Sequence, residues 1–272
     1  MTMTDLASLV IERTAANATS TANNAIPTRF AEIDQIVGGL SVGLTVLAGA
    51  PAIGSSCLAS QIALAAATDP TTSVAILPTS GGAGELICRL RRTLAPGSDG
   101  AERLWPDPLG HALEIPPGRI WVDTGVAHTI DEVDHTMRDW SRTTPATQRL
   151  VVVDGLHGIA GVDLRPRRGD RAAERLRRVA KEVNAAVLLT AQLQPRSRQS
   201  GWRPKLSELR AYGSVLDHSD LVILIHRDDY YTGAASDRHS DAELTLWSPQ
   251  SGSHQVSLCW SRSLLRFTDY DH

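Results

Sequence analysis

Cysteine is scarce in this sequence of 272 residues, which contains only Cys57, Cys88 and Cys259. The three lie far apart, without CxxC spacing and without clustered histidines, so neither a disulfide framework nor a zinc site is expected. This usage is typical of a reducing compartment, and we expect a cytoplasmic protein. Cys57 is expected to be a small buried helix residue rather than a reactive thiol.

Long apolar runs are also missing. No run approaches the roughly 20 residues that a membrane-spanning helix needs, so no membrane partner is expected. The first residues carry neither a basic region nor a long apolar region, which argues against a signal peptide. No long linker, internal repeat or low-complexity tract divides the chain. We expect a linker with a short amphipathic helix (residues 5–15) within residues 1–25, and one α/β domain over residues 26–272.

Six apolar runs recur along the chain, most of them separated by helical patterns, which predicts a mostly parallel central sheet flanked by helices. A capping box at Thr129 and Glu132 indicates one helix, and another is expected over residues 171–183 with arginines on its outer face. Three short runs near the end predict an antiparallel hairpin extension. The parallel strands are expected at 44–48, 74–77, 120–122, 150–153, 186–190 and 221–225, and the hairpin strands at 243–247, 255–260 and 264–267.

The most informative stretch is residues 44–67, where an apolar run leads into a glycine-rich loop and then a segment of helical period. This is the strand, loop and helix of a phosphate-binding P-loop, G-x-x-x-x-G-K-[ST], in which backbone N–H groups and a lysine bind phosphates. The glycine spacing and the final hydroxyl are present, but a serine stands in the lysine position. The loop residues of the expected nucleotide site are Gly49, Ala50, Pro51, Ala52, Ile53, Gly54, Ser55 and Ser56.

Two polar residues at the ends of later strands complete the expected nucleotide site. Asp154 follows the run 150–153, at the edge where ligands of open α/β sheets bind. In P-loop proteins such an aspartate holds Mg²⁺, although a strand ending in Asp often only begins a turn. Gln192 follows the run 186–190 and is expected to sense phosphate. The expected Mg²⁺ ligands are therefore Ser56 and Asp154, acting through a bound nucleotide.

Positive charge is concentrated between Gly161 and Lys205, where 12 lysines and arginines accompany 4 acidic residues, a local +8 that leaves −11 for the remainder. Such asymmetry suggests one basic face and a polyanionic partner. Two basic loops in this segment predict contacts to single-stranded DNA that do not depend on base sequence. The alternative is that these loops are merely solvated. The expected DNA-binding residues are Arg165, Arg167, Arg168, Arg196, Arg198, Arg203 and Lys205.

Several segments together resemble the RecA-fold motor domain of DnaB-type replicative helicases. IPTRF at 26–30 and GGL at 38–40 look like the approach to its P-loop, and RPKLSELR at 203–210 and RDDYY at 227–231 look like the segment after its glutamine-containing strand. The resemblance covers about residues 26–267. It implies a RecA-like P-loop fold, ATP with Mg²⁺ at subunit interfaces, and a hexameric ring around single-stranded DNA, in which the linker helix docks on the neighbouring subunit.

The departures from this family are concentrated at its catalytic positions. Of the nucleotide-site residues that the resemblance implies, this sequence retains Ser56, Asp154 and Gln192. Glu85 lies near the lost catalytic carboxylate, and we weigh it as a substitute base. The P-loop lysine, the catalytic glutamate, and the lysine and arginine finger of the C-terminal hairpin fall on Ser55, Ser80, Ser248 and Gln250, respectively.

Three hypotheses follow from the sequence. The first is a catalytically impaired, DnaB-like pseudo-ATPase that binds nucleic acid or forms rings as a replication accessory, with ATP or ADP and Mg²⁺ bound weakly or not at all. The second is an active helicase or translocase with relocated catalytic groups, such as an arginine from residues 165–171, Arg262 or Arg266. The third is a structural interaction protein that binds neither nucleotide nor DNA.

Overall fold

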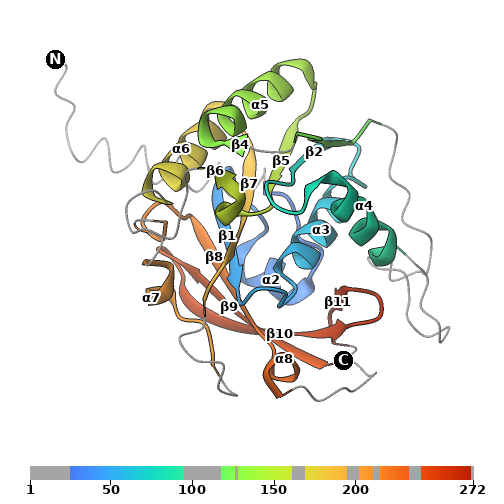
Figure 1. The fold of residues 1–272 in the computed structure, drawn as a ribbon, viewed down its shortest axis with the longest axis vertical. Coiled ribbons are helices and arrows are strands. Elements are labelled where there is room, and N and C mark those ends of the chain that lie inside the picture. Colours follow the sequence, from blue (N-terminus) through green and yellow to red (C-terminus); the bar gives the residue numbers. More distant parts are fainter. Residues whose placement is uncertain are drawn as a thin grey trace.

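The computed structural model describes residues 25–94, 118–125, 128–160, 169–194, 202–210, 213, 215–232 and 240–270. Within this part of the chain, one large sheet is flanked by helices (Figure 1). The helices are α2 (Ala31–Val37), α3 (Ser55–Ala66), α4 (Gly82–Thr93), α5 (Ile130–Thr143), the 3-10 turn η1 (Leu156–Gly158), α6 (Gly169–Glu182), α7 (Leu206–Leu209) and α8 (Asp228–Thr232). The strands are β1 (Gly43–Gly49), β2 (Thr72–Leu77), β3 (Ile120–Val122), β4 (His128–Thr129), β5 (Gln148–Val153), β6 (Ile159–Ala160), β7 (Ala186–Gln192), β8 (Leu221–His226), β9 (Ser240–Ser248), β10 (Gly252–Ser261) and β11 (Arg266–Thr268).

The nine-stranded sheet has the order β11-β10-β9-β8-β1-β7-β5-β2-β3. From β8 to β3 every pairing is parallel, whereas β8, β9, β10 and β11 pair antiparallel. Because parallel strands all end at the same edge, the loops that follow β1, β2, β5 and β7 gather on one side of the molecule. The predicted α/β fold with a mostly parallel sheet and an antiparallel C-terminal extension is confirmed.

The core consists of two layers, one on each face of the sheet. Successive strand residues point to opposite faces, so that Val46 packs with α5 and α6 while Leu47 packs with α2 and α3. The fully apolar strands that the sequence shows are therefore explained by burial on both faces. Of the helices in the described ranges, none is long and apolar enough to cross a bilayer.

The local signals in the sequence correspond closely to the element ends. The capping box of α5 is confirmed, because the Thr129 hydroxyl accepts a hydrogen bond from the Glu132 N–H at 3.2 Å and the Glu132 carboxylate accepts one from the Thr129 N–H at 2.6 Å. The sequence pattern predicts that the last strand begins at residue 264, and this is wrong, because β11 begins at Arg266. The chain is still turning at residues 262–265, where Leu265 has a positive φ of 51°.

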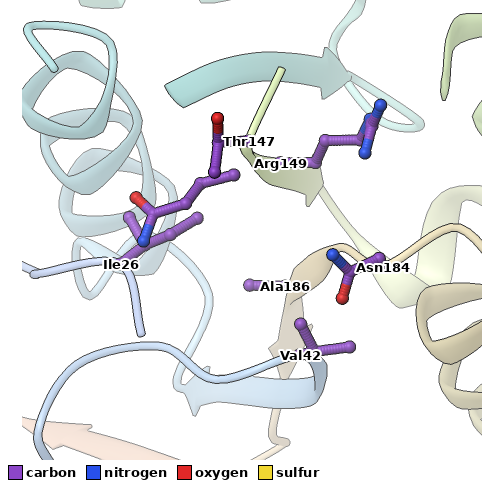
Figure 2. A pocket seen from close by; sticks show the side chains of 7 residues that line it. Ile26, Val42, Thr147, Arg149, Asn184 and Ala186 are labelled. Atoms are coloured by element: carbon purple, nitrogen blue, oxygen red, sulfur yellow. The ribbon is translucent and has the colours of Figure 1, made fainter. Parts of the chain in front are cut away.

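A small pocket lies at the edge where the parallel strands begin (Figure 2). Its lining includes residues at or next to the starts of β1, β5 and β7, and its volume is about 10 Å³. That volume is close to the smallest space that holds one water molecule. The pocket is lined by Ile26, Val42, Thr147, Gln148, Arg149, Asn184 and Ala186. It is therefore too small for a nucleotide, and it lies at the opposite edge from the predicted loop.

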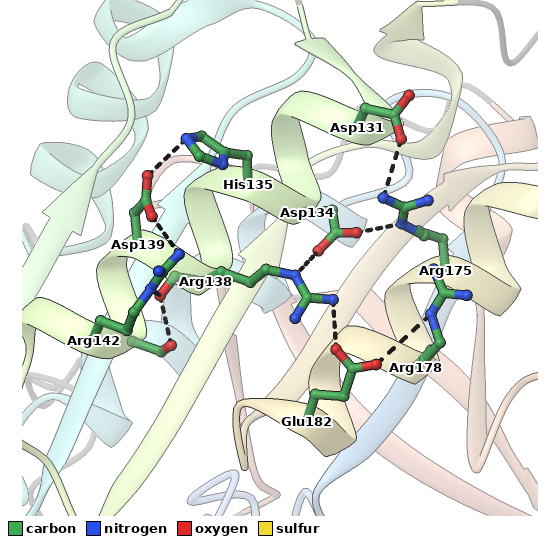
Figure 3. A network of polar contacts seen from close by, with 10 residues as sticks. Asp131, Asp134, His135, Arg138, Asp139, Arg142, Arg175, Arg178 and Glu182 are labelled. Carbon is green, nitrogen blue, oxygen red and sulfur yellow. Dashed lines mark hydrogen bonds and ion pairs between the residues drawn. The ribbon is translucent and has the colours of Figure 1, made fainter.

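A network of ion pairs joins α5 to α6 (Figure 3). Its centre is Asp134, which is 3% exposed and accepts hydrogen bonds from the Nε atoms of Arg138 and Arg175. Arg138 also pairs with Glu182, and Arg175 pairs with Asp131. The two helices are thus held together above the sheet by charged side chains as well as by apolar contacts.

The helix over residues 171–183 was expected to carry arginines on its outer face, and the structure shows that three of these arginines make ion pairs there. Arg175 pairs with carboxylates of α5, Arg177 donates to Asp220, and Arg178 lies 3.9 Å from Glu182. These three guanidinium groups are engaged within the fold. The excess positive charge of residues 161–205 is therefore partly neutralised within the fold. Only part of the charge on α6 remains for a polyanionic partner.

Replacing Asp134 with Asn is expected to lower the free energy of unfolding by about 1.5–3 kcal/mol at pH 7, the range for hydrogen bonds to charged groups. Burial raises the pKa of Asp134, but the hydrogen bonds from Arg175 and Arg138 outweigh it and lower the pKa below the ordinary 3.8. A lowered carboxyl pKa stabilises the fold at pH values above the unfolded pKa, and this stabilisation is lost as the pH falls through the folded pKa. Urea denaturation of wild type and variant should therefore show a difference that shrinks below about pH 4.

The matched control is Asp139→Asn, on the same helix. Its side chain is 49% exposed and pairs with His135 and Arg142 at the surface, where ion pairs contribute little to stability. A loss at Asp139 as large as the loss at Asp134 would contradict the assignment of stability to the buried carboxylate.

Candidate nucleotide-binding site

The glycine-rich loop connects β1 to α3 at the edge where the parallel strands end. Gly49, the last residue of β1, is paired in register with Gln192 of β7 and Ile225 of β8. Pro51 and Ala52 are exposed at the tip of the loop. The structure thus brings the predicted loop and Gln192, which is half-buried, to the same point on the sheet.

Close packing explains the glycine at the start of the loop. A side chain at Gly49 would bring its Cβ within 2.8 Å of the Ile53 Cγ2 atom and 2.9 Å of the Ile225 carbonyl oxygen. The loop closes in a turn in which the Ile53 N–H donates to the Ala50 carbonyl at 3.2 Å. Ile53 is fully buried and anchors the loop in the core.

Helix α3 begins directly after the loop, at Ser55. Its N-cap is Gly54, which has no side chain to cap the first turn. The first N–H groups of a helix have no acceptor within the helix, and the helix dipole adds partial positive charge at that end. The start of α3 therefore offers backbone donors to an anion, without a lysine beside them.

Asp154 lies opposite this helix start and receives three side-chain hydrogen bonds. Its Oδ1 atom accepts from the hydroxyls of Ser56 and Thr190, both at 2.7 Å, and its Oδ2 atom accepts from Nη1 of Arg89 at 2.9 Å. The structure thus brings together Ser56 and Asp154, the two predicted metal ligands. Sequence reasoning missed Arg89 and Thr190, because Arg89 lies within a helix and Thr190 lies among the apolar residues of β7.

Glu85 is engaged by the same arginine. Its Oε1 atom lies 3.3 Å from Nη2 of Arg89 one turn further along α4, and its side chain is 62% exposed. This spacing of four residues is the local signal that could have drawn attention to Arg89. Ser80, which was expected to fall at the family's catalytic glutamate, is half-buried and donates its backbone N–H to the Asp154 carbonyl at 3.1 Å.

Arg227 holds the loop from the other side. The residue is 5% exposed, and its Nη1 atom donates to the Ile53 carbonyl at 3.1 Å. Its Nε and Nη2 atoms donate to the Asp229 carboxylate at 3.0 and 2.9 Å, and the guanidinium lies 4.5 Å from the centre of the Trp260 ring. Arg227 therefore positions the loop rather than presenting its charge to a ligand.

The cysteine next to the loop hydroxyls is not activated. Cys57 is 8% exposed, and burial raises the pKa of its thiol to about 11, against the lowering effect of the nearby Arg89 charge. The thiol therefore stays protonated at neutral pH, as expected for a small buried helix residue.

The hairpin positions that the family uses on a neighbouring subunit lie at the turn between β9 and β10. Ser248 is buried and its hydroxyl accepts a hydrogen bond from the Ser251 N–H at 3.0 Å, whereas Gln250 is exposed. Arg266, considered above as a relocated finger, is 1% exposed. That part of the second hypothesis is wrong, because a buried guanidinium does not reach another subunit, whereas Arg262 is exposed.

Two of the predicted DNA-binding residues fall in the described part of the chain. Lys205 is exposed, and Arg203 is bound by Glu243 and lies 3.1 Å from the His226 ring. Arg203 borders a groove of about 430 Å³ over β8, β9 and β10. Its charge is thus partly compensated within the fold. The predicted residues Arg165, Arg167, Arg168, Arg196 and Arg198, and the linker helix over residues 5–15, lie outside the described residues.

Similarity to known proteins covers most of the chain. A family model described as "DnaB-like helicase C terminal domain" matches residues 25–269. The chain is 27% identical over 221 residues to the replicative DNA helicase DnaC of Bacillus subtilis (strain 168), an alignment that covers 76% of this chain and 48% of that protein. It is 25% identical over 257 residues to the replicative DNA helicase DnaB of Leifsonia xyli subsp. xyli, covering 90% and 56%. The chain thus spans about half the length of these curated relatives.

Two solved structures share the fold. One, described as an ATPase domain, superposes with a TM-score of 0.77 at 22% identity, covering 97% of this chain and 98% of that one. A DnaB-like replicative helicase, described with its interactions with primase, superposes with a TM-score of 0.78 at 21% identity, covering 99% and 68%. At these identities the likeness shows the fold alone.

Proposed function

The chain belongs to the family of DnaB-like helicase C-terminal domains, and from this premise we propose that it is a member with a disabled ATPase. Its proposed role is that of a nucleic-acid-binding or ring-forming accessory to DNA replication in the cytoplasm. ATP or ADP binds its loop weakly or not at all.

The observation that carries the proposal is a phosphate-site frame without the charged groups that phosphoryl transfer needs. Backbone donors at the start of α3 and the Ser56–Asp154 pair are in place. Ser55 stands where the family pattern has a lysine, and Ser80 stands where it has a glutamate. A frame of this kind supports binding of an anion more than it supports catalysis.

The expected loss of rate is large. Removing one preorganised charge contact from a transition state costs roughly 10²–10³ in rate, and an arginine finger contributes roughly 10³–10⁵. Losses of groups that act together do not simply add. Even so, with Ser55, Ser80 and Gln250 in place of the family's lysine, glutamate and arginine, we expect little ATP hydrolysis. Binding suffers less, because backbone amides and the helix dipole remain.

Two features support a nucleic-acid partner. The curated relatives are named replicative DNA helicases, and the chain carries its excess of lysine and arginine between residues 161 and 205. Contacts from lysine and arginine to the phosphate backbone bind single-stranded nucleic acid without regard to base sequence, and they weaken steeply as the salt concentration rises. Self-association into a ring, or assembly with an active helicase, is the second part of the proposed role.

Steady-state ATP hydrolysis by the purified chain tests the proposal. The assay compares wild type with Asp154→Ala, in Mg²⁺, with and without single-stranded DNA. We expect background rates in both proteins under both conditions. Turnover of about 1 s⁻¹ or above, a rate ordinary for enzymes, that is stimulated by DNA and lost in Asp154→Ala would instead establish a working motor with relocated catalytic groups.

Fluorescence anisotropy with labelled single-stranded DNA tests the other half of the proposal. We expect binding at about 50 mM salt that weakens steeply by about 200 mM, because phosphate contacts release counterions, with losses in affinity of about 10³–10⁵ for six to ten contacts. Absence of binding at both salt concentrations would favour the purely structural hypothesis.

A further inference from the structure

Asp154 meets a guanidinium where the family pattern has a metal ion. The residue is 5% exposed, the Arg89 side chain is 13% exposed, and their closest atoms are 2.9 Å apart. Charge-assisted hydrogen bonds of this length are among the strongest in proteins. The negative charge of Asp154 is thus compensated by the positive charge of Arg89, which belongs to α4.

The other oxygen of this carboxylate is also hydrogen-bonded. Oδ1 accepts from Ser56 of α3 and from Thr190 of β7, so that three elements converge on one side chain. Mg²⁺ in a P-loop site takes the loop hydroxyl and the water shell held by this aspartate. Here a divalent ion would have to displace the guanidinium or sit beside it, and like charges repel strongly where water is excluded.

The second carboxylate near this pair does not complete a metal site. Glu85 is largely exposed and lies against the same guanidinium, and the position of the family's glutamate holds Ser80. Over the described residues, no group of three or more His, Cys, Asp or Glu side chains is placed to hold a metal. Mg²⁺ sites of this kind need only one or two carboxylates beside phosphate and water oxygens, so what does not fit Mg²⁺ here is the guanidinium already bound to Asp154.

We propose that Arg89 takes the place of the divalent metal at Asp154, so that this site is neutralised by a protein cation and excludes Mg²⁺. The inference goes beyond the proposed loss of hydrolysis, because it concerns which cation the site accepts. It also narrows the ligand class, since a phosphate group at the start of α3 would meet a guanidinium instead of a metal. Arg89 then acts as a residue that sets the specificity of the site.

Binding of Mn²⁺, which takes the same oxygen ligands as Mg²⁺, tests this by electron paramagnetic resonance on the whole chain. The wild type and Asp154→Asn should give the same Mn²⁺ signal, because Asp154 in the wild type binds no Mn²⁺. Arg89→Met should gain one bound Mn²⁺ per chain, with an affinity at least about 10- to 100-fold above the detection limit set by the wild type, the range by which partners of ligands alter metal affinity. Arg89→Met/Asp154→Asn should lose it again.

Arg91→Met is the matched control, because it removes the same charge from an exposed position on the same helix. Equal Mn²⁺ affinity in Arg89→Met and Arg91→Met would overturn the inference. If Arg89→Met does not fold, the wild type alone decides: one bound Mn²⁺ that disappears in Asp154→Asn also overturns it. Mn²⁺ binding by wild type without ATP hydrolysis would overturn this inference and leave the proposed function standing.

Discussion

Gly54→Ala is expected to lower the free energy of unfolding by about 2–6 kcal/mol, combining backbone strain of about 1–3 with overpacking of about 1–3. Gly54 has a φ of 118°, a conformation that residues with a side chain rarely adopt. The added Cβ would also lie 2.8 Å from Cζ of Phe267 and 3.5 Å from Cζ3 of Trp260. Both costs act at the end of the phosphate loop. Urea denaturation at neutral pH measures the loss.

Two controls separate strain from crowding. Gly252→Ala also places a side chain at positive φ (74°), but nothing lies within 4 Å of the new Cβ, so it should lose the strain component alone. Phe267→Leu opens space beside Gly54, and the double variant Gly54→Ala/Phe267→Leu should lose less than the sum of the two single variants. A loss in Gly54→Ala no larger than in Gly252→Ala would show that crowding against Phe267 is unimportant.

Arg227→Met should destabilise the protein by about 3–5 kcal/mol, the range for removing one partner of a buried ion pair. The change leaves the Asp229 carboxylate, which is 19% exposed, without the donors that hold it. It also removes the donor to the Ile53 carbonyl and the contact with the Trp260 ring. Thermal and urea denaturation measure the stability, and hydrogen exchange at loop amides measures the freedom of the loop.

The pair can be tested by a double-mutant cycle. Arg227→Met/Asp229→Asn removes both charges, so it should cost less than the sum of its two single variants. Arg262→Met removes a charge from an exposed position, and its effect should be small. Simple additivity of the Arg227 and Asp229 variants would refute the claim that their pairing stabilises the loop.

Much of the fold could be predicted because its signals are local. Each predicted parallel strand lies inside an observed strand, since a short apolar run between turn signals suits burial on both faces. The α5 capping box needs only Thr129 and its own first turn. The start of β11 lies two residues after the predicted start, because Leu264 is buried in the turn and looks in sequence like a strand residue.

The site was predictable only in its outline. Gly49, Ser56 and Asp154 lie in patterns that adjoin strands, so sequence alone led to them. Sequence alone gave no role to Arg89 or Arg227, because their partners lie 65 residues away at Asp154 and 174 residues away at Ile53. The arginines of α6 were expected on its outer face, and the sequence did not show that the carboxylate partners of Arg175 and Arg177 belong to other elements.

By itself, the sequence determined the order of strands and helices, the place of the phosphate loop, and which charged groups are missing from it. These depend on periodicity, glycine spacing and residue identity along the chain. Only the tertiary structure decided which charges compensate one another: Arg89 with Asp154, Arg227 with Asp229, and Asp134 with Arg138 and Arg175. Ion pairs depend on distance in space and on exclusion of water. For Arg89 with Asp154 and for Arg175 with Asp134, whose partners lie on different elements, both are set only when the fold brings distant segments together.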